Sequence, residues 1–85
     1  MKIHVVVSGR NYHRANDFPT DLDLPEGTGS LEAVRLLREK VGDDALPDGT
    51  LVAVSGSHLG TVAACRDVPL RDGDELVFIA PVAGG

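Results

Sequence analysis

The residues with the clearest chemical potential stand at the end of the chain, where Gly84 and Gly85 precede a free carboxylate. Neither glycine carries a side chain, so a backbone of peptide width can enter a narrow active site and present its last carbonyl. In this interpretation Gly85 is a substrate for a partner enzyme. A frayed chain end without function would show the same two residues, because termini are normally the least constrained part of a domain.

Other reactive side chains form no recognisable catalytic or metal-binding pattern. Cys65 could accept a persulfide, but a small buried residue is the interpretation that we favour, because Arg66 is its only basic neighbour. His4, His13 and His58 lie far apart and show no ligand spacing, so we expect no metal site. The hypothesis for function therefore depends on the elements that position the last residues.

The first elements predict a hairpin and a helix. Lys2 to Ser8 is expected to form a strand, and Thr20 to Leu24 alternates apolar and acidic residues as a second strand. Ser30 is the expected N-cap of a helix over residues 31–41, and Gly42 is the expected C-cap. The apolar stripe of this helix consists of Leu31, Val34, Leu37 and Val41, widened by Leu36.

The second half of the chain predicts two further strands around a segment that is hard to interpret. Residues 50–54 form one expected strand, whereas the segment from Ser55 to Arg66 is interrupted by glycines and shows no clear period. After the Asp-Gly turn at residues 72–73, Leu76 to Ile79 are apolar throughout and should form a central strand. The predicted fold class is α+β, with a mixed four- or five-stranded sheet and one main helix packed on one face.

The expected final strand has two apolar faces, of which the helix can cover only one. Leu76 and Phe78 are expected to face the helix, whereas Val77 and Ile79 should face away from it together with Val6. An uncovered apolar sheet face next to the glycine end is typical of a partner site, although a small apolar patch of no consequence is the alternative. The expected organisation is one domain over residues 1–80 and a flexible tail over residues 81–85.

The composition describes one small acidic domain of 85 residues. A net charge of −5 argues against nucleic acid as a partner and suits either docking onto a basic protein surface or plain solubility. One cysteine excludes an internal disulfide and suits a reducing compartment. No apolar run approaches membrane-spanning length, so we expect a cytoplasmic protein that does not bind membranes.

Two segments resemble a known family, namely Pro-Leu-x-Asp-Gly-Asp-Glu over residues 69–75 and the ending Pro-Val-Ala-Gly-Gly over residues 81–85. With the order strand, strand, helix, strand, strand, the chain resembles the ubiquitin-like sulfur carriers of the β-grasp fold. The small subunit of molybdopterin synthase (the MoaD type) is the most similar, followed by carriers of the thiamine pathway. Carriers for cysteine synthesis also remain open, and the resemblance assigns no role to Arg10–Arg14 or Ser55–Arg66.

The resemblance implies a definite chemistry at Gly85. A partner related to ubiquitin-activating enzymes would use MgATP to adenylate the Gly85 carboxylate, and sulfur would displace AMP to leave a thiocarboxylate (1-thioglycine). A larger synthase subunit (the MoaE type) would accept the tail and pass the sulfur to a pterin precursor of the molybdenum cofactor. The chain itself would bind no cofactor stably, would supply no catalytic side chain, and would be a monomer alone and a hetero-oligomer in the complex.

The resemblance and the predicted sheet together define the expected site. The reactive residues are Gly85 and Gly84, and the expected partner interface consists of Val6, Leu59, Val77, Ile79, Pro81, Val82 and Ala83. Two alternatives from other classes remain open at this point. One is a ubiquitin-like modifier that links Gly85 to lysines of other proteins, and the other is a β-grasp interaction module whose glycine end is incidental.

Overall fold

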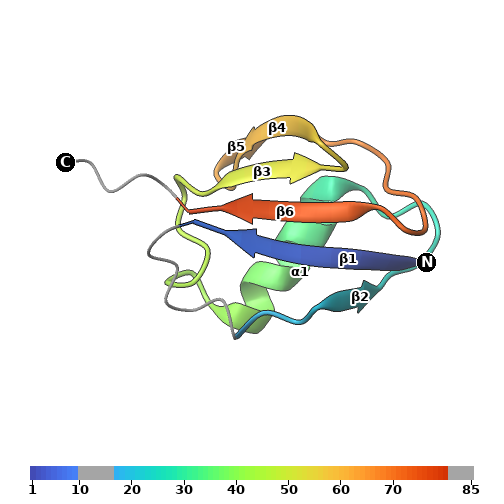
Figure 1. The fold of residues 1–85 in the computed structure, drawn as a ribbon, viewed down its shortest axis with the longest axis horizontal. Coiled ribbons are helices and arrows are strands. Elements are labelled where there is room, and N and C mark those ends of the chain that lie inside the picture. The colour runs from blue at the N-terminus through green and yellow to red at the C-terminus, as the bar shows by residue number, and fades with distance from the viewer. Residues whose placement is uncertain (10–16, 81–85) are drawn as a thin grey trace.

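One helix and six strands form the part of the chain that the computed structural model describes, which is residues 1–9 and 17–80. In chain order they are β1 (Lys2–Ser8), β2 (Asp21–Asp23), α1 (Ser30–Val41), β3 (Leu51–Val54), β4 (Ser57–Thr61), β5 (Ala64–Cys65) and β6 (Glu75–Ile79). The strands form one mixed sheet in the order β2-β1-β6-β3-β4-β5, in which only β1 and β6 run parallel. Helix α1 crosses one face of this sheet (Figure 1), which is the β-grasp arrangement predicted from the sequence.

The core lies between α1 and the sheet and is built from alternate residues of the central strands. Leu76 and Phe78 of β6 are fully buried, as are Ile3 of β1 and Val52 of β3. The ring of Phe18 packs against Phe78 with a centroid distance of 5.9 Å. Because successive strand residues point to opposite faces, burial of these residues leaves their neighbours on the other face of the sheet.

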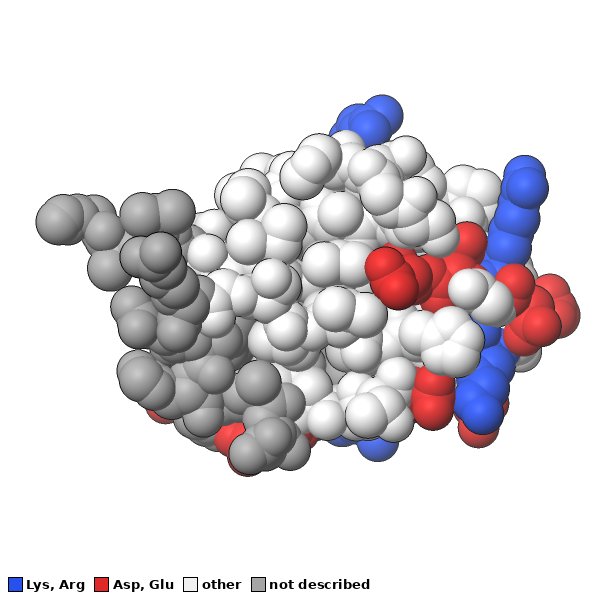
Figure 2. All heavy atoms as spheres, in the orientation of Figure 1, with Lys and Arg blue, Asp and Glu red and all other residues white. Residues whose placement is uncertain are grey.

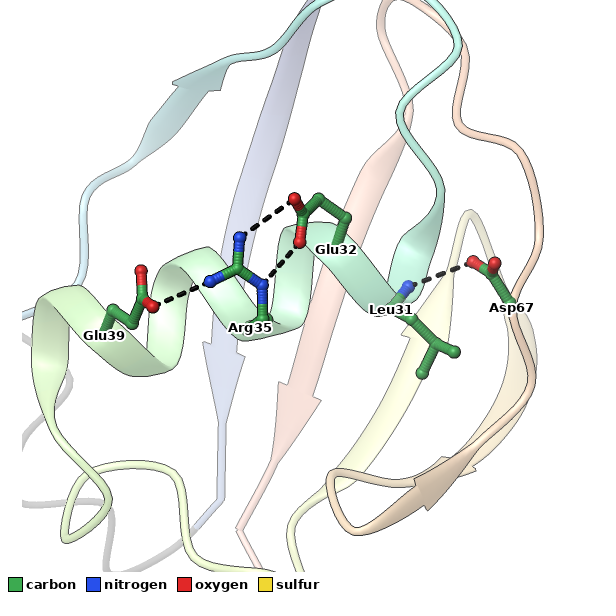
Figure 3. A network of polar contacts seen from close by, with 5 residues as sticks. All are labelled: Leu31, Glu32, Arg35, Glu39 and Asp67. Carbon is green, nitrogen blue, oxygen red and sulfur yellow. Dashed lines mark hydrogen bonds and ion pairs between the residues drawn. The ribbon is translucent and has the colours of Figure 1, made fainter.

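The start of α1 differs from the prediction. Gly29 is the N-cap, and Ser30 lies inside the helix with its hydroxyl buried, where it donates to the Arg66 carbonyl and accepts from the Val68 amide. The capping carboxylate comes from Asp67, which accepts a 3.2 Å hydrogen bond from the Leu31 amide (Figure 3). A carboxylate at this end is favourable because the first helical amides have no partner within the helix.

The apolar stripe of α1 is shifted relative to the predicted one. The helix buries Ala33, Val34, Leu37 and Val41, whereas Leu31 is 45% exposed. The solvent side carries a charge ladder in which Arg35 pairs with Glu32 at 2.6 Å and with Glu39 at 2.7 Å (Figure 3). This ladder holds the pKa of Glu32 below its ordinary value, chiefly through the hydrogen bond from Arg35. The predicted end of the helix at Gly42 is confirmed.

The sheet has more strands than the four or five that were predicted, because the segment between Ser55 and Arg66 forms β4 and β5. Ser55 and Gly56 both have positive φ angles and turn β3 into β4. Gly60 resembles a strand breaker in the sequence, yet it lies within β4 opposite Cys65. A Cβ at Gly60 would lie 2.5 Å from the Ala64 carbonyl oxygen, so the close approach of β5 requires glycine here.

The expected domain over residues 1–80 contains all the elements above, and the expected tail over residues 81–85 lies outside the described residues. The whole of the Arg10–Arg14 segment also lies outside them, because residues 10–16 are not described. Among the residues that are described, no helix has the length and apolar character needed to cross a membrane.

Candidate partner-binding site

Strand β6 carries the chain from the middle of the sheet to residue 80, after which the Gly-Gly ending follows in the sequence. β6 lies between β1 and β3, so both of its edges are hydrogen-bonded. The Ala80 amide extends the pairing with β1 by a 2.9 Å hydrogen bond to the Ser8 carbonyl. The residue before Pro81 is therefore held by the sheet, whereas Pro81, Val82, Ala83, Gly84 and Gly85 lie outside the described residues.

Gly9, directly after β1, lies in close contact with Ala80, directly after β6. Its φ angle is +132°, a conformation that residues with side chains rarely adopt. A Cβ at Gly9 would lie 2.5 Å from the Ala80 Cβ and 3.0 Å from the Ala80 nitrogen. The ends of β1 and β6 can therefore approach each other this closely only with glycine at position 9, and this approach fixes the point from which the final residues depart.

The sheet face opposite α1 carries an apolar surface next to this point. The strand register aligns Val6, Val77 and Ala53 in one row, and it pairs Leu51 with Ile79 in the next. We call these five residues the open face. Val6 is 37% exposed and Leu51 is 40% exposed, and Val77 and Ile79 are half-buried, whereas Ala53, which pairs with Val77, is buried. Figure 2 views this side of the molecule and shows an uncharged expanse over the middle of the sheet.

Charged residues gather at the far end of the same face, away from Ala80 (Figure 2). His4 lies between Glu75 and Asp21 in the register, and its Nδ1 is 2.8 Å from an Asp21 carboxylate oxygen. The adjoining turn adds Asp72, which accepts from the Lys2 amide, and Asp74, which accepts from the Arg71 amide. This face of the sheet is thus apolar near the departing chain, where the open face lies, and mainly acidic at its other end.

The structure brings together three of the residues expected at a partner interface and removes one. Val6, Val77 and Ile79 lie side by side on the open face, which confirms the predicted facing. Leu59 was also expected at the partner interface, and this expectation was wrong, because its side chain is only 5% exposed and belongs to the core. The pairing of β3 with β4 shifts between Val52 and Ala53, and such a bulge changes the face to which a strand residue points.

Leu51 is an interface candidate that sequence analysis missed. The interpretation of residues 50–54 as a strand did not say which residues pointed outward, because the four consecutive apolar residues 51–54 show no polar alternation to mark its orientation. Pairing of Leu51 with Ile79 decides the question, since directly paired residues share a face of the sheet.

Other candidate reactive groups are not arranged for chemistry. Cys65 is half-buried against the core, and this burial raises the pKa of its thiol above the ordinary value. A raised pKa keeps the thiol protonated at neutral pH, so it is a poor nucleophile. In the described parts of the chain, no group of three or more His, Cys, Asp or Glu residues is placed to hold a metal ion.

Comparisons with known proteins extend over the whole chain. The chain is 30% identical over 91 aligned residues to an uncharacterized protein of Archaeoglobus fulgidus, and the match covers all of both proteins. It is 26% identical over 85 residues to a protein of Drosophila yakuba named molybdopterin synthase sulfur carrier subunit, covering all of this chain and 92% of that protein. No family model matches the chain, and no solved structure matches it significantly. The chain therefore belongs to one family with the archaeal protein and is similar, over its whole length, to a sulfur carrier subunit of molybdopterin synthase.

Proposed function

We propose that this protein is a sulfur carrier whose Gly85 is adenylated and converted to a thiocarboxylate, and that it acts as the small subunit of a molybdopterin synthase. The observation that carries the proposal is the position of the open face. Val77 and Ile79 present it from the same strand that leads into the Gly-Gly ending. The whole-length likeness to a named sulfur carrier subunit supports the same function.

The proposed reaction requires no side chain of this protein. A carboxylate is a poor electrophile until one of its oxygens becomes part of a good leaving group. Attack of the Gly85 carboxylate on the α-phosphorus of ATP would release pyrophosphate and form an acyl adenylate. The terminal sulfur of a persulfide would then displace AMP to form an acyl disulfide. A thiol would cleave its sulfur–sulfur bond, becoming oxidised to a disulfide, and release a thiocarboxylate, which is a good nucleophile near neutral pH.

The contribution of the fold to this reaction is positioning. A partner that binds the open face holds β6, and β6 is tied to β1 up to Ala80. Only the five residues after Ala80 then separate the held surface from the reacting carbonyl. Restricting the reacting group in this way replaces a bimolecular encounter with a nearly intramolecular one. The acidic end of this sheet face, beyond the open face, favours a partner whose docking surface is basic.

Two changes to the chain end test the proposal. Addition of one alanine after Gly85 should abolish sulfur loading. The terminal carboxylate would then lie one residue further along the chain, on a residue that carries a methyl side chain. Deletion of Gly84 and Gly85 should abolish loading as well. Both variants should unfold at the wild-type temperature, because the buried core of the described chain is built from residues 3–78, which neither variant changes. Loading that survives either change would contradict the proposed reaction.

Three further measurements distinguish the proposed function from its alternatives. Sulfur transfer from loaded protein to a pterin acceptor, in the presence of a larger synthase subunit, would support the molybdopterin pathway over thiamine or cysteine synthesis. Covalent conjugates of higher mass in a lysate with ample sulfur would instead indicate a ubiquitin-like modifier. Full function of the deletion variant would indicate an interaction module with an incidental glycine end.

A further inference from the structure

Strand β2 forms one edge of the sheet, and its outward backbone groups have no strand partner in the described residues. Thr20 and Leu24 hydrogen-bond to β1, through Val5 N to Thr20 O and Leu24 N to Met1 O, both at 2.8 Å. In an antiparallel pair these inward-bonding residues alternate with residues whose N–H and C=O groups point outward. Asp21 and Asp23 therefore direct their backbone groups away from β1.

A groove of about 570 Å³ runs beside this edge, between β2 and α1. Residues 21–24 form one wall, and Leu36, Glu39 and Lys40 of the helix form the other. Leu36 is half-buried and packs against the core from the groove side. An added strand that paired with Asp21 and Asp23 would therefore place every second side chain in the groove, against an apolar floor.

The negative charge at this edge favours pairing with a positively charged strand. Asp21 and Asp23 project on the opposite side of β2 from the buried Leu22. Across the groove, Glu39 is already paired with Arg35 and lies beside Lys40, so the two aspartates supply the negative charge of this edge. Asp21 already contacts His4, whereas the exposed Asp23 has no ion-pair partner among residues 1–9 and 17–80. Pairing of β2 with a second copy of itself would bring aspartates together, which is unfavourable. The edge is also short and followed by Pro25, so it is protected against indiscriminate pairing.

We infer that the edge of β2 binds an extended basic segment of a partner protein as an added strand. Apolar side chains of this segment lie in the groove against Leu36, and the lysines or arginines between them lie beside Asp21 and Asp23. The backbone groups of the two aspartates provide the hydrogen bonds of the pairing. No open-face residue lies on β2 or lines the groove, so this site is distinct from the open face, and the inference goes beyond the proposed sulfur transfer.

Titration of the isotopically labelled protein with a blocked pentapeptide, in which three lysines alternate with two valines, tests the inference. Amide signals of residues 20–24 and of residues 36–40 should shift, and those of Val6, Val77 and Ile79 should not. A peptide of the same composition with its lysines and valines in separate blocks is the control for nonspecific charge attraction. Equal binding of this control, shifts on the open face, or no shift at low salt would overturn the inference.

Four variants separate the contribution of charge from that of backbone pairing. Asp23→Lys should weaken binding about tenfold and Asp23→Asn about threefold, because the contact is an exposed ion pair. Asp23→Pro removes the outward N–H without removing a hydrogen bond to β1, so it should abolish binding in a protein that remains folded. Glu75→Lys makes the same charge change as Asp23→Lys two strands away, on β6, and should leave the affinity within about twofold. Equal effects of Asp23→Lys and Glu75→Lys would contradict an edge site.

Discussion

The two faces of β6 differ although their residues alternate along the same five-residue strand. Leu76 and Phe78 are completely buried under α1, whereas Val77 and Ile79 lie half-buried on the face that nothing in the described chain covers. Both pairs are apolar, so composition does not distinguish them. The difference lies in what each face contacts, and it indicates that one face stabilises the domain while the other is available to a partner.

An apolar residue on a central strand therefore need not contribute to the core. An alternating strand would have marked its outer face with polar residues, as β2 does with Asp21 and Asp23. β6 instead keeps Val77 and Ile79, and β3 adds Leu51 opposite Ile79. Three apolar residues thus lie on a face that no described residue covers, where the proposed partner would bind.

The largest effect is expected on the covered face. Phe78→Ala should lower the free energy of unfolding by about 3–5 kcal/mol, because a fully buried ring leaves a cavity. The free energy of unfolding of a domain of this size is on the order of 4–13 kcal/mol, so the Phe78→Ala variant should be only marginally folded. Urea unfolding followed by circular dichroism measures the loss. A loss below about 1 kcal/mol would show that the assignment of the two faces is wrong.

The next effect is expected where the ends of β1 and β6 meet. Gly9→Ala should lower the free energy of unfolding by about 1–3 kcal/mol more than Gly27→Ala. Both substitutions place alanine at an unfavourable positive φ, but only Gly9→Ala also brings the new Cβ against Ala80. Gly27 is the matched control, with a positive φ and nothing within 4 Å of an added Cβ. Ala80→Gly should partly rescue Gly9→Ala. Absence of coupling in this double-mutant cycle would rule out the contact as the cause.

A change on the open face should affect binding more than stability. Ile79→Asp should weaken binding to an adenylating partner by at least tenfold, because a carboxylate replaces a half-buried apolar contact. Its cost in unfolding free energy should stay near 1 kcal/mol. Calorimetric titration and urea unfolding of the same preparation measure the two quantities. A larger loss of stability than that of Phe78→Ala would place Ile79 in the core and reverse the comparison.

The smallest effect concerns Cys65, which tests how far burial extends toward the β5 edge. Burial raises the pKa of its thiol above the ordinary 9.0, so the thiolate fraction at pH 8 should be lower than in an unfolded peptide. Alkylation by iodoacetamide should therefore be slower in the folded protein, and its rate should continue to rise as the pH passes above 9. Mass spectrometry of timed samples follows the reaction. Alkylation as fast as in urea would show that the side chain is fully accessible.

Elements with a strong period could be predicted from the sequence. The bounds of β1 were predicted to the residue, and the end of α1 at Gly42 was predicted by its glycine. The open face was also partly predicted, because alternation along β1 and β6 assigned Val6, Val77 and Ile79 to one side. These features depend on residues that are near one another in the sequence.

Features that depend on how the strands pair, or on residues distant in the sequence, could not be predicted. The carboxylate that caps α1 comes from Asp67, 36 residues after Leu31, so no local pattern reveals it. Gly60 looked like a break because its role, a close approach of β5, becomes visible only when the strands are paired. The error at Leu59 has the same origin, since the shift in register between β3 and β4 decides which way the strand residues point.

The intact mass of the protein after incubation with MgATP, a sulfur donor and an activating enzyme of the same organism tests the central claim most directly. We predict a mass gain equal to replacement of one oxygen by sulfur, and fragmentation should localise it to Gly85. Omission of ATP should prevent the gain. An unchanged mass, with an enzyme that is active on its own carrier and with a folded protein, would contradict the assignment as a sulfur carrier.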